Sequence, residues 1–298
     1  MRTQRTIKDC IYFEGVGLHT GAYCKVTLHP APVDTGIVFY RPCKKASLSA
    51  NINTVVDTTY ATTIGNERLK VRTVEHLLAV VSAMGITNLT IEVEGPEIPI
   101  LDGSAHEIAK LVWDTGLRKQ KKSMPYIKVL QPVVLEDDHG KVAAYPYDGR
   151  KITFRLFFKN HFLGEQLASF DIDRGSFVNE IAPARTFGFL KDVEYFRANG
   201  LAKGGSLDNA LIFSETAVIN ESGLRFRDEC VRHKILDSIG DFSLIGLPIE
   251  GHIVADKSGH TMNIKFLNKL LACSDCWEVV SDQVVEKTPI PVFSYSYT

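Results

Sequence analysis

Two histidines and an aspartate in this chain of 298 residues have the types and the spacing of a metal site that could hydrolyse a bond. His233 and Asp237 are four residues apart, so on a helix both side chains would project from one face and could bind one ion. His76 offers a third ligand from a distant stretch, which leaves the fourth tetrahedral position free for water, as in catalytic zinc sites. Glu75, directly before it, could be the general base.

The ligand types leave the metal partly open. Two imidazoles and one carboxylate suit zinc better than calcium or magnesium, but iron(II) takes the same set. Each motif is weak alone, because a histidine and a carboxylate at helical spacing occur by chance in many proteins. His260, which follows Ser258 and Gly259, is by itself as consistent with a loop histidine as with catalysis. The motifs therefore predict a hydrolytic metal site only jointly.

Composition excludes several classes of protein. A chain that is 45% hydrophobic and 23% charged is globular and can form one large domain or two. The formal net charge of −1 gives no basic field, so nucleic acid is not an expected partner. No run of about 18 uncharged apolar residues occurs, and no apolar signal segment follows the basic first residues. We expect a soluble, cytoplasmic protein without stable membrane insertion, and nothing demands more than a monomer.

The six cysteines are expected to be reduced thiols, because their spacing is irregular and the chain is too large to need disulfide bonds. Cys273 and Cys276 have the spacing of a metal or redox pair, but no second such pair completes a zinc ribbon. A late helix with two small residues is the favoured interpretation.

Periodicity predicts the elements that position the first ligand. Residues 6–42 alternate like strands and contain turn signals, which predicts a β-meander. Thr73 can cap a helix with apolar residues at helical spacing, which Gly85 ends. Glu75 and His76 would then lie in its first turn, where the helix dipole favours an anion. Glu75 should therefore stay ionised near neutral pH unless burial overrides the dipole.

The order of elements predicts a duplication. A strand over 88–94 and a helix precede the polar, basic run 117–123, which we interpret as a linker; a solvated loop within one domain is the alternative. Strand-rich sequence over 126–173 and a helix over about 228–242 then repeat the order of the first half. Ligands from both halves predict a metal in the cleft between two domains.

Seven motifs, in order and over nearly the whole chain, resemble one family. They are GVGLHTG at 15–21, TVEHL at 73–77, EIPILDGSA at 97–105, ARTFGF at 184–189, GGSLDNA at 204–210, VRHKILD at 231–237 and KSGH at 257–260. The chain resembles the zinc-dependent UDP-3-O-acyl-N-acetylglucosamine deacetylases of lipid A biosynthesis in Gram-negative bacteria.

The resemblance implies an α+β fold of two similar domains, each a β-sheet packed on a helix pair, with the helices sandwiched between the sheets. With the linker as boundary, the domains are 1–122 and 123–298. It implies hydrolytic deacetylation of UDP-3-O-acyl-N-acetylglucosamine to UDP-3-O-acyl-glucosamine and acetate, the committed step of lipid A biosynthesis. A zinc ion would be held by His76, His233 and Asp237.

The family's other catalytic roles carry over to matching positions. The resemblance implies Glu75 as general base and His260 as a second catalytic histidine. Asp241 would hold that histidine, and Thr186 would supply the hydroxyl that contacts the reacting oxygen. Implied substrate contacts are Lys234, Phe187, Thr63, His19 and Lys257.

An amphipathic nucleotide-sugar substrate fits further features. The apolar insertion over about 187–213, with a helical run over 191–199, is expected to form a lid or channel for the 3-O-acyl chain. Lys234 and Lys257 are expected at the diphosphate, and aromatic residues over 154–158 would either stack on uracil or form strand core.

Two alternatives stay open. One is a zinc amidohydrolase that acts on another N-acyl substrate. The other is a non-catalytic nucleotide-sugar binding protein with structural zinc, against which Glu75 argues, because a structural site has no use for an unliganded carboxylate beside its metal.

Overall fold

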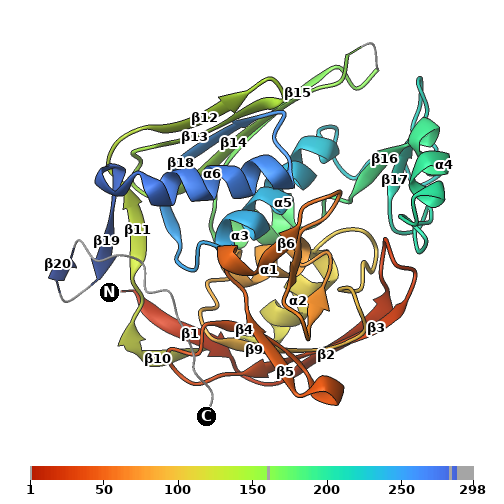
Figure 1. Ribbon diagram of the computed structural model, residues 1–298. Coiled ribbons are helices and arrows are strands. Elements are labelled where there is room, and N and C mark those ends of the chain that lie inside the picture. Colours follow the sequence, from red (N-terminus) through yellow and green to blue (C-terminus); the bar gives the residue numbers. More distant parts are fainter. Residues whose placement is uncertain (1, 160–161, 282–283, 287–298) are drawn as a thin grey trace.

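Two β-sheets form opposite faces of the molecule, and the long helices lie between them (Figure 1). The computed structural model describes residues 2–159, 162–281 and 284–286. The long helices are α1 (Glu75–Ala83), α2 (His106–Thr115), α5 (Glu229–Ser243) and α6 (His260–Ala272). The predicted α+β class, with helices sandwiched between the sheets of two similar halves, is confirmed.

The amino-terminal half contributes one large sheet and two small ones, of which one pairs β1 with a strand described below. Its strands are β1 (Thr3–Ile7), β2 (Ile11–Val16), β3 (Tyr23–Pro30), β4 (Ile37–Arg41), β5 (Ala46–Ser49), β6 (Val55–Asp57), β7 (Thr63–Gly65), β8 (Lys70–Val71) and β9 (Leu89–Glu94). The large sheet has the order β2-β3-β9-β4-β5, and β6, β7 and β8 form a small antiparallel sheet. The predicted meander is wrong beyond its first hairpin, because β9 pairs between β3 and β4.

The carboxyl-terminal half contributes the second large sheet. Its strands are β11 (Tyr126–Val129), β12 (Val133–Asp137), β13 (Gly140–Tyr145), β14 (Arg150–Phe157), β15 (Glu165–Asp171), β18 (Ile249–Asp256), β19 (Trp277–Ser281) and β20 (Val284–Glu286). The insertion contains β16 (Phe187–Phe189), α4 (Leu190–Ala198) and β17 (Leu211–Phe213), with β16 and β17 parallel. Short helical turns occupy Pro42–Lys44, Ile52–Thr54, α3 (Arg174–Ser176), Phe177–Ile181 and Ser274–Cys276.

The two large sheets repeat one topology, which bears out the expected duplication. The order β2-β3-β9-β4-β5 of the first half matches β12-β13-β18-β14-β15 of the second. In each, the fourth strand is parallel to the central one, and the connection between this pair contains a long helix, α1 or α5. A second helix, α2 or α6, follows the central strand. Helices α1 and α5, which carry the predicted metal ligands, therefore occupy equivalent positions.

The interpretation of residues 117–123 as a linker is wrong. This run is strand β10 (Leu117–Ser123), which pairs antiparallel with β1. Its lysines lie on an exposed strand, where charged side chains discourage pairing with another chain. The hydrogen bonds between β10 and β1 make this segment a strand, although its polar, basic composition is typical of a solvated loop. The domain boundary at residue 122 stays a prediction.

Burial follows the predicted patterns elsewhere. In β9, Leu89, Ile91 and Val93 are fully buried while the residues between them are not. Helix α5 is buried almost throughout, as expected of a helix between two layers. Within the described part of the chain, no helix has the length and apolar character needed to span a membrane.

Candidate metal and catalytic site

Most of the predicted site residues line one cavity of about 600 Å³. Those that line it are His19, Glu75, His76, Thr186, Phe187, His233, Lys234, Asp237, Lys257 and His260. They come from α1, α5, the first residue of α6, the loop between β18 and α6, the loop after β2, and the start of the insertion with the residue before it. Segments from both halves of the sequence therefore meet at the cavity.

His76, His233 and Asp237 form a compact group of possible metal ligands. Their ligand atoms all lie within 4.8 Å of one another, and all three side chains are buried. Asp237 Oδ1 is 3.3 Å from His233 Nε2 and 3.6 Å from His76 Nε2. The two imidazole rings are nearly perpendicular, with centroids 4.9 Å apart. One carboxylate oxygen and two ring nitrogens at this spacing are a donor set that zinc accepts.

The donor atoms also have protonation states that suit a metal. His233 Nδ1 lies 3.0 Å from the carbonyl oxygen of Ala184, which can only accept, so Nδ1 carries the hydrogen. Burial lowers the pKa of His233 to about 4, so the ring is neutral near pH 7 and Nε2 keeps its lone pair. Burial would raise the pKa of Asp237, but His233 and Lys234 outweigh it and hold that pKa well below its usual range. The residues present therefore fit a divalent metal.

A close crossing of two helices brings the ligands together, and Gly240 permits it. A Cβ atom at this position of α5 would lie 2.0 Å from the carbonyl oxygen of Glu75, in the first turn of α1. Only a residue without a side chain lets the two backbones approach this closely. The crossing sets Glu75 and His76 beside the α5 residues His233 and Asp237.

The start of α1 differs from the prediction. The helix begins at Glu75 without a side-chain cap. Thr73 instead has a φ of 56°, and its hydroxyl donates to Glu97 Oε1 at 2.7 Å. The fully buried Glu97 also accepts hydrogen bonds from the backbone N–H groups of His19 and Thr20. One carboxylate, missed as a site residue although it lies in a quoted motif, thus fixes both the entry to α1 and the loop that carries His19.

Glu75 is buried beside the ligand group. The backbone N–H of Thr62 donates to its Oε2 at 3.0 Å, and His260 Nε2 lies 3.9 Å from its Oε1. Burial raises the pKa of Glu75 to about 7, although the charges of His260 and His76 oppose the rise. The helix dipole was expected to keep this carboxylate ionised unless burial overrode it, and burial does raise its pKa. A carboxyl group that titrates near neutral pH can accept and release a proton.

His260 is held by a buried carboxylate, as the family resemblance implies. Its Nδ1 lies 2.9 Å from Asp241 Oδ2. Burial alone would lower the pKa of His260, but the charge and hydrogen bond of Asp241 outweigh it and raise that pKa to about 9. The Asp241 carboxylate also accepts hydrogen bonds from the Thr62 hydroxyl at 2.6 Å and from Asn263 Nδ2 at 2.8 Å.

Thr62 and Asn263 were not predicted. Asn263 could have been found, because it follows His260 by three residues on α6 and so shares its face. Thr62 gives no such signal, since it reaches the site from a distant loop.

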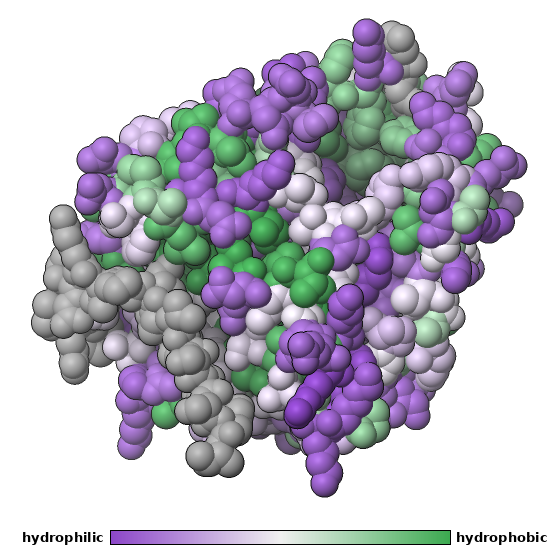
Figure 2. Space-filling model, in the orientation of Figure 1, coloured by the Kyte–Doolittle hydropathy of each residue, from purple (hydrophilic) through white to green (hydrophobic). Residues whose placement is uncertain are grey.

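The insertion contributes an aromatic wall. Phe187 contacts His233 with ring centroids 6.3 Å apart, and Phe213 also at 6.3 Å. Phe158 packs 6.0 Å from Phe187, and the half-exposed Phe162 packs 6.1 Å from Phe213. Figure 2 shows hydrophobic residues gathered at the upper right of the molecule, where Figure 1 has the β14–β15 hairpin beside the insertion. An apolar surface therefore leads from the ligand group towards solvent.

Two predicted lysines line the cavity in different settings. Lys234 Nζ donates to Asp237 Oδ2 at 2.7 Å, and Asp237 offsets the effect of burial and raises the lysine pKa. Lys257 Nζ lies 5.7 Å from the ring centroid of the exposed Phe157, whereas Phe154 is fully buried strand core. Lys265 also lines the cavity and was not predicted.

Two predicted residues do not line the cavity. Asp241 lies behind His260, as its predicted role requires. Thr63 is buried in β7, and its hydroxyl has no hydrogen-bond partner among the described residues. The neighbouring Thr62 makes the contacts with Glu75 and Asp241 instead.

Comparison with known proteins identifies the family of the chain. Residues 4–272 match the family LpxC, described as UDP-3-O-acyl N-acetylglycosamine deacetylase. A UDP-3-O-acyl-N-acetylglucosamine deacetylase of Thermodesulfovibrio yellowstonii is 49% identical over 95% of this chain and 96% of its own length. Proteins of the same name from Syntrophotalea carbinolica and Pseudomonas entomophila are 46% and 44% identical, over 93% and 97% of this chain and 90% and 97% of their own lengths. The chain therefore belongs to the LpxC family of UDP-3-O-acyl N-acetylglycosamine deacetylases.

Proposed function

We propose that this chain hydrolyses the acetamide of UDP-3-O-acyl-N-acetylglucosamine, with zinc, to UDP-3-O-acyl-glucosamine and acetate, the committed step of lipid A biosynthesis. The observation that carries the proposal is the group of His76, His233 and Asp237 in a cavity that also presents Glu75 and His260. The substrate follows from family membership and from the shared name of the relatives.

In this proposal His76, His233 and Asp237 hold the zinc ion. When bound, zinc supplies Lewis acidity, which lowers the pKa of water towards about 7 and polarises a carbonyl group. The neutral ring of His233 and the ionised Asp237 support the assignment. Iron(II) accepts the same donors and is the second candidate for the metal in the cell.

The chain's own groups then move the protons. Glu75 takes a proton from the attacking water, which its pKa of about 7 permits. The Thr186 hydroxyl and the cationic His260 donate to the developing oxyanion, and a donor of this kind contributes roughly 2.7 to 4 kcal/mol in comparable sites. Asp241 keeps His260 cationic, so that His260 can protonate the leaving amine.

The remaining assignments concern the substrate's two ends. The insertion, with Phe187 at its start, would hold the 3-O-acyl chain, where each buried methylene contributes about 0.8 kcal/mol. Lys234, Lys257 and His19 would contact the sugar nucleotide, with Phe157 available to stack on uracil. Thr63 remains a proposed contact near the metal.

The setting of the reaction completes the proposal. A nucleotide sugar as substrate supports a cytoplasmic location. We propose a monomer, since the ligand group, Glu75 and His260 all come from one chain.

The deciding experiment restores the metal. The purified protein is stripped with a chelator and given one equivalent of zinc or iron(II), and acetate release from UDP-3-O-acyl-N-acetylglucosamine is measured, with His233→Ala as control. Turnover that returns with zinc in the parent but not in the variant supports the proposal. Zinc binding without acetate release would favour an amidohydrolase for another N-acyl group or a binding protein, and turnover that ignores metal would refute the metal role.

A further inference from the structure

We infer that Arg185 and Glu229 are positioning residues, which hold the Ala184 carbonyl against His233 and thereby fix the direction of a metal ligand. The inference rests on the proposed role of His233 in metal binding. Neither residue lines the cavity, and neither belongs to the catalytic group described above.

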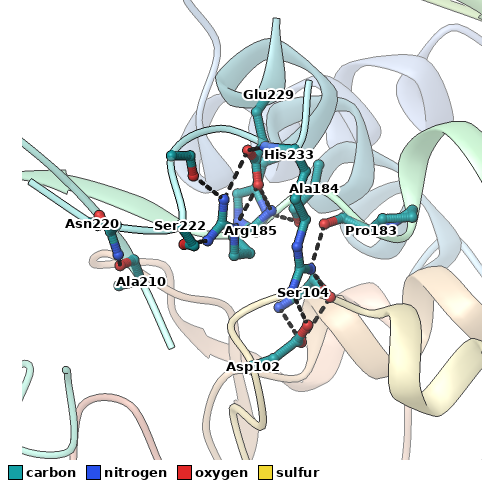
Figure 3. Close-up of polar contacts among 12 residues, drawn as sticks. Asp102, Ser104, Pro183, Ala184, Arg185, Ala210, Asn220, Ser222, Glu229 and His233 are labelled. Carbon is teal, nitrogen blue, oxygen red and sulfur yellow. Dashed lines mark hydrogen bonds and ion pairs between the residues drawn. The ribbon is translucent and has the colours of Figure 1, made fainter. Parts of the chain in front are cut away.

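Glu229 is a fully buried carboxylate with several donors directed at it. Its Oε1 accepts hydrogen bonds from the backbone N–H of Arg185 at 3.0 Å and from Nε of the same residue at 2.9 Å. Its Oε2 accepts from Arg185 Nη2 at 3.2 Å and from the backbone N–H of Arg225 at 2.7 Å. The rest of the Arg185 guanidinium donates to Ser222 Oγ at 3.2 Å and to the carbonyl oxygen of Gly223 at 2.7 Å. The two charged side chains of the pair therefore hydrogen-bond directly to each other and to surrounding polar groups (Figure 3).

Two adjacent residues, Ala184 and Arg185, are hydrogen-bonded to side chains on successive turns of α5. Glu229 and His233 are four residues apart on this helix and share a face. Arg185 is bound to Glu229 through both its backbone and its side chain, while the preceding Ala184 accepts from His233 Nδ1 at 3.0 Å. Because the backbone N–H of Arg185 belongs to the peptide unit that contains the Ala184 carbonyl, fixing one atom fixes the other.

His233 needs such an anchor because two acceptors compete for its ring hydrogen. Asp237 Oδ1 lies 3.3 Å from Nε2, and a carboxylate there attracts a proton to the nitrogen that must bind the metal. The Ala184 carbonyl keeps the hydrogen on Nδ1 only while it stays within reach. Groups behind a metal-ligating histidine commonly orient it and change metal affinity about 10- to 100-fold when they are removed.

A second arginine ties the same segment to the other half of the molecule. Arg225 Nη1 donates to the carbonyl oxygen of Pro183 at 2.8 Å, and Nη2 donates to Asp102 Oδ2, also at 2.8 Å. The segment 183–185 is thus held from α5 and from the loop before α2. A buried ion pair adds little net stability on average, so its location behind His233 is the more informative feature.

The test uses Glu229→Gln, which keeps the size of the side chain and removes its charge. Glu250→Gln is the matched control, because Glu250 is also buried, pairs with Arg2 at 2.9 Å and lies on β18 away from the cavity. Zinc affinity is measured by chelator competition, and exchange of the His233 Nδ1 hydrogen with water is measured by NMR in the zinc-loaded protein. Melting temperatures report stability separately.

We expect Glu229→Gln to bind zinc about 10- to 100-fold more weakly and to exchange the His233 Nδ1 hydrogen faster, whereas Glu250→Gln changes neither. The inference is overturned if Glu229→Gln and Glu250→Gln melt at the same temperature and Glu229→Gln keeps the zinc affinity and the His233 Nδ1 exchange rate of the parent. Arg185 and Glu229 would then contribute only to the packing of the core. If Glu229→Gln does not fold, the same measurements are made on Arg185→Lys. This variant keeps the positive charge but loses the paired hydrogen bonds of the guanidinium to Glu229. Unchanged zinc affinity in His233→Ala would refute the proposed function itself and is measured alongside.

Discussion

Burial of Glu75 makes it suited to a reaction that needs a proton accepted and then released. Its pKa of about 7 arises mainly from burial, and the opposing charges of His260 and His76 keep the rise moderate. At neutral pH a substantial fraction of this carboxyl is ionised, and the proton that it accepts can leave again. A surface carboxyl would accept a proton far less readily.

Replacing Glu75 by Gln should therefore abolish most turnover and leave zinc in place. The amide has nearly the same shape but cannot take a proton, so kcat should fall about 10²- to 10⁴-fold. Glu107→Gln is the control, because Glu107 occupies the first turn of α2 but is exposed. Steady-state acetate release and metal content are measured together. Turnover close to that of the parent would remove Glu75 from the role of base.

Asp241→Asn should shift the pH dependence of turnover. The Asp241 charge raises the pKa of His260 to about 9, and the amide would remove that charge. If His260 acts as a cation, activity falls as pH rises through its pKa, so a lower pKa moves the alkaline limb of the kcat profile to lower pH. Asp171→Asn, at an exposed position, should leave the limb in place. An unmoved limb in Asp241→Asn would contradict a cationic role for His260.

For single residues, the sequence predicts those that line the cavity better than those that hold the lining residues in place. The spacing of His233 and Asp237 and the family motifs identified groups that the fold does bring together. The sequence did not predict the supporting residues Thr62, Glu97, Arg185 and Glu229, because their contacts join segments with no common periodicity. A hydrogen bond across many residues of chain leaves no trace in local spacing.

Helices α1 and α5 cross so closely that their contact tolerates no added atom at Gly240. In an open helix, alanine would stabilise by about 1 kcal/mol relative to glycine. Here a new Cβ would meet the Glu75 carbonyl oxygen at 2.0 Å, so the helices must separate.

Gly240→Ala should therefore destabilise the protein by about 1 to 3 kcal/mol. It should also weaken zinc binding, since the proposed ligands on α1 and α5 move apart. Melting temperature and zinc affinity are measured together. Gly188→Ala is the control, because its nearest new contact would be 3.9 Å away. A stabilised Gly240→Ala with unchanged zinc affinity would mean that the helices do not depend on this close approach.

Elements with strong periodicity were predictable, and those decided by distant pairing were not. The helix over about 228–242 and the strand over 88–94 matched α5 and β9, because their apolar spacing reports directly on burial. Residues 117–123 became a strand through pairing with β1, a partner more than 100 residues away. Thr73 had the chemistry of a helix cap but is engaged by Glu97 instead.

The site exists only where the two equivalent halves of the molecule pack together. His76 comes from α1, and the other two proposed ligands come from α5, its counterpart in the repeat. The order of elements in the sequence suggested this arrangement, but it could not show which side chains join the halves. Arg225 and Asp102 form one such link, with 2.8 Å between Nη2 and Oδ2.

Asp102→Asn should weaken this link in a pH-dependent way. Burial would raise the pKa of Asp102, but hydrogen bonds from Ser104 and Arg225 outweigh it and hold that pKa below its usual value. A carboxyl whose pKa is lower in the folded state stabilises above its unfolded pKa, and this contribution disappears as pH falls through the folded value. The variant should thus melt about 2 to 4 °C lower than the parent at pH 7, which is equivalent to about 1 kcal/mol for a partly exposed pair. This difference in melting temperature should shrink below about pH 4.

Asp114→Asn, which loses only an exposed pair with Lys110, is the control and should change little at either pH. A melting difference that is the same at pH 7 and pH 3 would mean that Asp102 joins the halves by shape and neutral hydrogen bonds rather than by its charge.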